Sequence, residues 1–190
     1  VRTNTHAEQI LTDKSGRVVG LKVKGKDGTY TIHSKAVVDA AGGFGANNEM
    51  VAKYVPRLKG FATTNHPGAT GDGLLLAEKI GAQLIQMDQI QTHPTVVPNV
   101  GEMITEAVRG NGAVLINKEG KRFFNELETR DKVSAAILKQ KDGVAYLFFD
   151  SDMQKSLKAT NNYIKQKYCL NGATLDEVAG KMGVPADTLK

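Results

Sequence analysis

Cysteine and long apolar runs are almost missing from this sequence, and each absence excludes a class of protein. A single cysteine, Cys169, among 190 residues rules out an internal disulfide framework and a cysteine-based zinc site. No run approaches the roughly eighteen apolar residues that a membrane-spanning helix needs. The start, VRTNTH, lacks Met, a basic leader and an apolar core, so we expect it not to be a signal peptide, and any export signal would lie upstream.

Positive charge is present but does not gather in one place. The net charge of +5 raises the possibility of nucleic-acid binding, yet the lysines are dispersed, for example Lys22, Lys59 and Lys139. Scattered lysines are typical of a solvated surface. The four histidines show no spacing suited to a metal ion, so we predict no metal site.

The first forty residues predict β structure. Short β-branched runs at residues 5–11, 18–23, 30–33 and 36–40 are separated by turns at 13–16 and 25–28. The last run, residues 36–41, is apolar on both faces and leads into Gly42-Gly43-Phe44-Gly45. This pattern is typical of a central parallel strand at the edge of a cofactor cleft, although a glycine turn after any strand looks similar.

A second glycine-rich turn lies at residues 68–73, after a predicted helix at 48–54. It opens a further helix that Gly81 should end, with Thr70 or Asp72 as the residue that caps its amino end. Its free amide groups suit an anion or an electron-rich ring edge, but an ordinary glycine-rich cap remains the alternative. The GxGxxG dinucleotide fingerprint is absent.

The second half predicts a mixture of strand and helix. We expect a hairpin-like unit over residues 114–124, a helix over 131–141 and a strand over 144–149. Residues 151–190 predict three helices and resemble a second, mostly helical domain. Residues 175–189 also have the look of a helix-turn-helix, although the would-be recognition helix carries no Arg, Asn or Gln to contact bases.

Residues 91–131 combine His, Thr, Glu and Arg side chains with several glycines. Such a set suits a site that holds a small dicarboxylate and delivers a proton to it. Pro94 favours an extended conformation at His93, although a lone His is often structural. In a helix, Glu106 and Arg109 would share a face and pair, which at a surface is worth at most about 1 kcal/mol.

Four motifs stand out in the second half of the sequence. They are Thr92-His93-Pro94-Thr95, Thr105-Glu106-Ala107-Val108-Arg109-Gly110, Gly120-Lys121-Arg122-Phe123-Phe124-Asn125-Glu126 and Thr129-Arg130-Asp131. Together they resemble the soluble fumarate reductase flavoproteins of the flavocytochrome c type, a family of the FAD-dependent fumarate reductase and succinate dehydrogenase superfamily. The resemblance covers essentially the whole chain.

The resemblance implies a mixed fold with both α/β and α+β character. Residues 1–97 would be the later part of an FAD-binding domain, and residues 98–190 part of an α+β capping (clamp) domain. The family's amino-terminal GxGxxG unit and its carboxy-terminal FAD segment are not in this sequence. We therefore expect an internal part of a flavoenzyme, truncated at both ends, which is inactive by itself and binds FAD weakly or not at all.

Site residues follow from the same resemblance. His93, Thr105 and Glu106 match substrate-site positions, and Arg130 matches the residue that protonates the substrate. Glu106 and Arg109 match the relay that returns a proton to Arg130. The turns that contact FAD match at the positions Ala41, Gly42, Gly43, Thr70, Gly71 and Asp72.

The implied activity is an FAD-dependent oxidoreductase of anaerobic respiration and electron transport, which reduces fumarate to succinate. An electron donor protein or domain would be a partner, and other domains of the complete protein would carry haem or covalent FMN if it has them. The same chemistry on urocanate or another 2-enoate is the alternative. Localisation stays open between bacterial periplasm, cell surface and cytoplasm. A nucleic-acid-binding module is the alternative of another class, and we expect no nucleic-acid partner.

Overall fold

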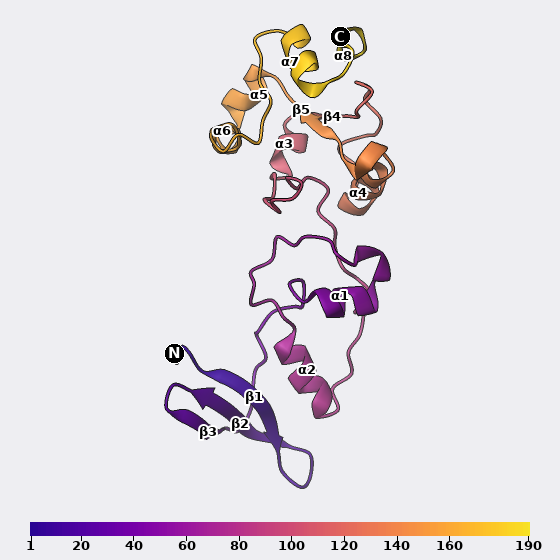
Figure 1. Cartoon of the computed structure of the whole chain (residues 1–190). Helices are drawn as coiled ribbons and strands as arrows, with labels where there is room; N and C mark the ends of the chain where they lie inside the picture. The colour runs from indigo at the N-terminus through magenta and orange to yellow at the C-terminus, as the bar shows by residue number, and fades with distance from the viewer. The chain divides into compact units, whose positions relative to one another are not determined.

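The computed structural model describes all 190 residues and divides them into two compact units, Val1–Ile90 and Gln91–Lys190 (Figure 1). Helix and strand occur in both units, in agreement with the mixed fold expected from the sequence. None of the helices is long and apolar enough to cross a membrane. The boundary at 97/98 expected for the complete protein stays a prediction.

The first unit opens with an antiparallel sheet of three strands in the order β1-β2-β3, which are His6–Thr12, Val18–Gly25 and Gly28–His33 (Figure 1). A tight turn pairs Gly25 with Gly28. Ile10 of β1 and Val23 of β2 are buried. They lie on the same face of the sheet, because Ile10 pairs with Leu21 and side chains alternate along a strand. The first three strands predicted from the sequence are confirmed.

The fourth predicted strand, residues 36–41, is wrong. The segment forms no hydrogen-bonded ladder with any part of the chain, and the sheet stops at β3. Val38 is 86% exposed, so its apolar faces are not covered. A doubly apolar run becomes a central strand only when partner strands and covering layers are present, and these residues have neither.

Two helices complete the first unit. The helix α1 (Asn48–Tyr54) is capped by the Asn47 side chain, which accepts from Met50 N, and a short 3-10 turn, η1 (Pro56–Leu58), follows. The helix α2 (Asp72–Lys79) starts after Gly71, whose φ is 81°. Capping by Thr70 or Asp72 is wrong, because the cap residue is Gly71 and no side chain caps the helix. The end before Gly81 is confirmed.

The second unit is built around a pair of antiparallel strands, β4 (Val114–Ile116) and β5 (Tyr146–Phe148). The hairpin-like unit is right in its turn, where Ile116 bridges Arg122. It is incomplete in its pairing, because the main partner of β4 is β5. The helical elements are α3 (Ala107–Gly110), α4 (Arg130–Leu138), η2 (Lys141–Gly143), α5 (Ser151–Ser156), α6 (Ala159–Lys165), α7 (Leu175–Met182) and α8 (Ala186–Leu189).

Three apolar clusters hold the second unit together. The first joins α3 to α5 and α6, the second joins β4 to α7, and the third joins β4 to α4. A separate helical domain from residue 151 onward is therefore wrong, because its helices cover the two strands. Two strands alone cannot bury an apolar face, so the helices must pack on them. The buried members are Val108, Ala113, Met153 and Tyr163; Ile116, Ala179, Met182 and Val184; and Leu115, Val133 and Ile137.

Candidate active site

The two glycine turns of the first unit lie against each other. Gly71 N donates to Gly43 O at 3.1 Å, and Ala46 N donates to Ala69 O at 2.9 Å. The Asn47 side chain adds a bond to Thr70 O at 2.9 Å. Two segments that are more than twenty residues apart in the sequence thus form one backbone surface.

Part of this surface is open. Gly42 and Gly43 are exposed, and a Cβ built on either would meet nothing within 4 Å. Ala41 N is held by Asp39 Oδ1 at 3.0 Å. The turn at 68–73 leads directly into α2, whose first amide groups favour an anionic neighbour. Gly42 and Gly43 thus present bare backbone that a ligand can approach, whereas Gly71 is buried against Phe44 and Met50. The contact of FAD with Ala41, Gly42, Gly43, Thr70, Gly71 and Asp72 stays a prediction.

In the second unit, one carboxylate joins two arginines. Glu106 Oε1 accepts from Arg109 Nη2 at 3.0 Å. Glu106 Oε2 accepts from Arg130 Nη2 at 2.6 Å and from Arg130 Nε at 3.0 Å. The pairing of Glu106 with Arg109, expected from their spacing, is confirmed. The structure also brings Arg130 to the same carboxylate from 24 residues away.

Packing of α3 and α4 explains this arrangement. Val108 is fully buried and holds the single turn α3 in the core, so the neighbouring Arg109 is buried with it. Arg109 Nη1 donates to Glu126 O. Arg130 is the first residue of α4 and follows Thr129, so its side chain extends from the helix end. There it reaches Glu106 and also Gln91. The Gln91 Oε1 atom accepts from Arg130 Nη1 at 2.6 Å.

Exposure and charge differ along this line of residues. The side chain of Arg109 is 2% exposed, whereas Glu106 and Arg130 are 45% and 37% exposed. The hydrogen bonds from Arg130 lower the pKa of Glu106 below its ordinary value. The same carboxylate raises the pKa of Arg130. The line therefore runs from a buried cation through a carboxylate, held in its charged form, to a cation that solvent or a small molecule can reach.

His93 and Thr105 lie on two neighbouring segments. Thr95 Oγ1 donates to Ile104 O at 2.8 Å, Ile104 N donates to Thr95 O at 2.9 Å, and Thr95 N donates to His93 Nδ1 at 3.4 Å. Burial lowers the pKa of His93, and the positive charge of Arg130 adds to this effect. His93 is thus favoured as a neutral hydrogen-bonding group close to the charged cluster.

Three residues around this site have no role predicted from the sequence. Gln91 accepts from Arg130, Glu126 supplies the carbonyl that holds Arg109, and the Tyr163 hydroxyl accepts from Thr105 N at 3.0 Å. Glu126 ends a motif that carries the family resemblance, which was a usable signal. Tyr163 lies 58 residues from Thr105, and no local pattern connects the two.

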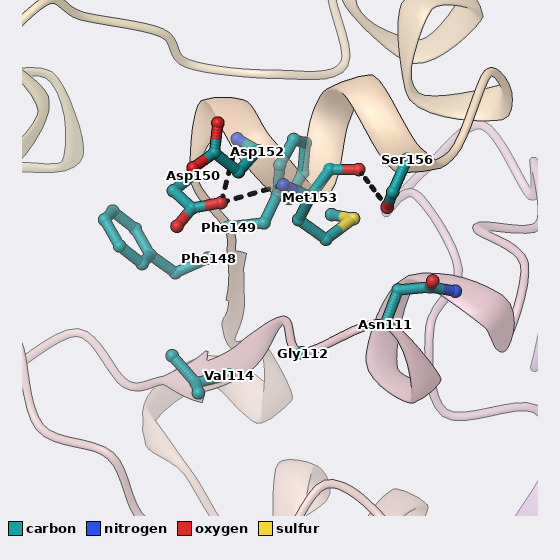
Figure 2. Close-up of a pocket in the computed structure, with 9 residues that line it drawn as sticks. All are labelled: Asn111, Gly112, Val114, Phe148, Phe149, Asp150, Asp152, Met153 and Ser156. Atoms are coloured by element: carbon teal, nitrogen blue, oxygen red, sulfur yellow. Dashed lines mark hydrogen bonds between the residues drawn. The ribbon is translucent and has the colours of Figure 1, made fainter.

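A hollow of about 540 Å³ lies elsewhere in the second unit, between β4, β5 and α5 (Figure 2). Its Asp150 carboxylate already accepts from Asp152 N at 3.1 Å and Met153 N at 2.9 Å, which caps α5. None of the site residues predicted from the sequence lines it. We therefore place the candidate active site at the Glu106 cluster and not in this hollow. The lining residues are Asn111, Gly112, Val114, Phe148, Phe149, Asp150, Asp152, Met153 and Ser156.

Known proteins resemble this chain over most of its length. A fumarate reductase (cytochrome) from Shewanella frigidimarina is 54% identical over 165 residues, 86% of this chain and 29% of that protein. A urocanate reductase from Eggerthella lenta is 46% identical over 154 residues, 78% of this chain and 25% of that protein. The open conformation of a flavocytochrome c3 fumarate reductase aligns with a TM-score of 0.76 and 41% identity, over 97% of this chain and 33% of that chain.

The chain spans about a third or less of the length of these relatives. Within that span, a model of the family described as FAD binding domain matches residues 1–189, which takes in both the glycine turns and the Glu106 cluster. The family expected from the motifs is thus shown by sequence and by fold. This chain belongs to the FAD binding domain family of flavoproteins.

Proposed function

We propose that this chain is the acid-delivering part of a flavin-dependent reductase that converts fumarate to succinate. The observation that carries the proposal is the Glu106 carboxylate, which bonds to Arg109 through one oxygen and to Arg130 through the other. In the complete protein, residues 1–97 would belong to the FAD-binding domain and residues 98–190 to a capping (clamp) domain. An electron donor protein or domain would reduce the flavin.

Each residue has a distinct task in this proposal. Bound FAD, once reduced, would supply the hydride. His93 and Thr105 hold the carboxylates of the substrate, with Glu106 at the edge of the same site. Arg130 donates a proton to the alkene carbon next to the one that accepts hydride. Its positive charge also stabilises the negative charge that develops in the transition state.

Arginine is a weak acid, and the arrangement around Arg130 addresses this difficulty. Its guanidinium is charged at every pH a protein meets, and Glu106 raises its pKa further. Proton transfer becomes favourable only because hydride arrival creates a much more basic carbon beside it. Neutral Arg130 then regains its proton through Glu106, whose charged carboxylate first accepts one from Arg109. Arg109 in turn is recharged from solvent, so each turnover takes up one solvent proton. The bifurcated contact of Glu106 with both arginines supports such a relay.

The likeness to named reductases supports the reaction class, and the substrate is open to a direct test. One relative is named a fumarate reductase and another a urocanate reductase. Fumarate is the first candidate, because Thr105-Glu106 matches the fumarate-type motif. Urocanate or another 2-enoate is the second. Reduced viologen oxidation by the complete protein, measured with each acid in turn, distinguishes them through the ratio of kcat/KM values.

The substitution Arg130→Ala in the complete protein tests the acid. Fumarate reduction should fall by at least about a thousandfold, in the range of a lost general acid. FAD should stay bound, because the glycine turns are in the other unit. Lys132→Ala, an exposed cation on the same helix, is the control and should keep activity within about twofold. Turnover retained in the Arg130→Ala protein would contradict the proposal.

A further inference from the structure

Glu126 is a buried acid whose side-chain carboxylate and backbone carbonyl accept hydrogen bonds from different residues. Its side chain is only 4% exposed. The Oε1 atom accepts from Leu115 N in β4 at 2.7 Å and from Arg122 Nε at 3.0 Å, and Oε2 accepts from Arg122 Nη2 at 2.6 Å. The backbone oxygen of the same residue accepts from Arg109 Nη1. Glu126 therefore ties β4, the loop that follows it and Arg109 to one point.

Arg109 has few hydrogen-bond partners, and one of them is the backbone carbonyl of Glu126. Its guanidinium is almost completely buried, and its Nε atom has no hydrogen-bond partner. The remaining partners are the Glu106 carboxylate, on a half-exposed side chain, and the Glu126 carbonyl. A buried cation with few partners is held in place by those it has. The Glu126 carbonyl is the more rigid of the two, because its own side chain is anchored in the core.

The Glu126 carboxylate is held by one main-chain amide, Leu115 N, and by one charged side chain, Arg122. Leu115 is 1% exposed and lies in β4, so its N–H is a fixed donor. Arg122 meets both carboxylate oxygens, a fork-shaped contact that sets direction as well as distance. Burial raises the pKa of Glu126, but the bonds from Arg122 and Leu115 N outweigh it and keep the pKa below the ordinary value. The side chain is thus charged and held by three hydrogen bonds, one from the main chain of β4 and two from Arg122, whose own side chain is 60% exposed.

We propose that Glu126 is a positioning residue for the proton relay, which holds the Arg109 guanidinium against Glu106 through its anchored backbone carbonyl. The inference rests on the function proposed above and assigns a role to Arg122 and Glu126. These two residues belong to a motif that carried the family resemblance but received no site role from it. Glu126 contacts neither substrate nor FAD in this proposal, and it acts only through Arg109.

The substitution Glu126→Gln in the complete protein tests this role. Glutamine keeps an oxygen for Leu115 N but loses the charge that pairs with Arg122, so the carbonyl is no longer fixed. We expect kcat for fumarate to fall about tenfold, the size typical of residues that orient a functional side chain. KM should change less than about twofold, because His93 and Thr105 are untouched. The matched control is Lys132→Gln, which breaks the exposed pair with Glu128 at the same i,i+4 spacing and should leave kcat unchanged.

A double-mutant cycle separates positioning from a general structural effect. In an Arg109→Lys background, Glu126→Gln should lower kcat by less than about twofold, because the group that it positions is already altered. An equal loss in both backgrounds, or a rise in KM at constant kcat, would overturn the proposal. If the Glu126→Gln protein does not fold, Arg122→Gln takes its place in the cycle with the same expectation. A wild-type protein that does not reduce fumarate would instead overturn the proposed function.

Discussion

The two units present their chemistry in different ways. The first offers bare backbone, in two glycine turns joined by Gly71 N and Gly43 O. The second offers side chains, centred on Glu106 between two arginines. The second unit also contains the larger apolar core, because all three apolar clusters lie in it. The buried apolar residues of the first unit are divided between the sheet and α1–η1: Ile10, Val23, Met50, Val55 and Leu58.

This difference shows that the two kinds of site depend on different forces. A backbone site depends on the φ and ψ angles that glycine permits, and it needs little core around it. A network of charged side chains needs packed elements that hold each group, since unsupported ion pairs contribute little. Substitutions in the first unit should therefore affect flavin binding, and substitutions in the second should affect proton transfer to the substrate.

The largest expected effect comes from the chain of 190 residues produced by itself. It should retain little or no flavin and show no fumarate reduction, because it lacks the GxGxxG segment that the family resemblance assigns to pyrophosphate binding. Absorbance of the purified chain in the visible range, and reduced viologen oxidation, are the measurements. Yellow, flavin-loaded protein would show that the backbone surface of the first unit suffices.

Next in size is Gly71→Ala in the complete protein. The new Cβ would lie 2.8 Å from Phe44 Cβ and 2.9 Å from Met50 Sδ, at a φ of +81°. Left-handed strain and overpacking each cost about 1–3 kcal/mol, so unfolding free energy and flavin content should both fall. Gly60→Ala is the matched variant, with a φ of +83° but open space and outside the predicted FAD contacts, and it should lose only the strain part. Denaturant unfolding and the flavin-to-protein absorbance ratio measure both; equal losses would contradict the contact argument.

A smaller effect is expected from Tyr163→Phe in the second unit. The substitution removes the hydroxyl that accepts from Thr105 N at 3.0 Å, at a cost of about 1 kcal/mol. Because Thr105 is proposed to hold a substrate carboxylate, KM for fumarate should rise about fivefold, the factor that corresponds to this energy. Tyr168→Phe, on the same apolar cluster, is the control. A fall in kcat without a change in KM would assign Tyr163 to another step.

The smallest effect concerns the protonation of His93. Its pKa should lie below the ordinary 6.5, mainly because of burial and then because of Arg130, and Arg130→Gln should raise it part of the way back. Between the folded and the ordinary pKa the unfolded chain binds more protons, so the stability contribution of His93 falls as pH drops through this window. An NMR titration of the His93 ring measures the pKa. A value at or above 6.5 would contradict the placement of His93 beside the arginines.

Local pattern was sufficient for most elements of the fold. The predicted boundaries of α1 are those observed, and β1–β3 follow their β-branched runs. The errors came from residues whose state depends on distant partners. Residues 36–41 have a strand pattern but no neighbouring strand to pair with, and the helices from α5 onward have no local sign that they cover β4 and β5. Gly71 occupies the cap position of α2 at a φ of +81° and against Phe44 and Met50, where a residue with a side chain would be strained.

By itself, the sequence determined the family, the residue types of the site and the local pairing of Glu106 with Arg109, because i,i+3 spacing brings two residues of a helical turn together. Only the tertiary structure decided which distant groups complete the site. Arg130 contacts Glu106 because α3 and α4 both pack against Leu147 of β5. Tyr163 contacts Thr105 because α6 and Val108 of α3 belong to the same apolar cluster. Such contacts depend on how elements pack, and a pattern of neighbouring residues carries no information about that.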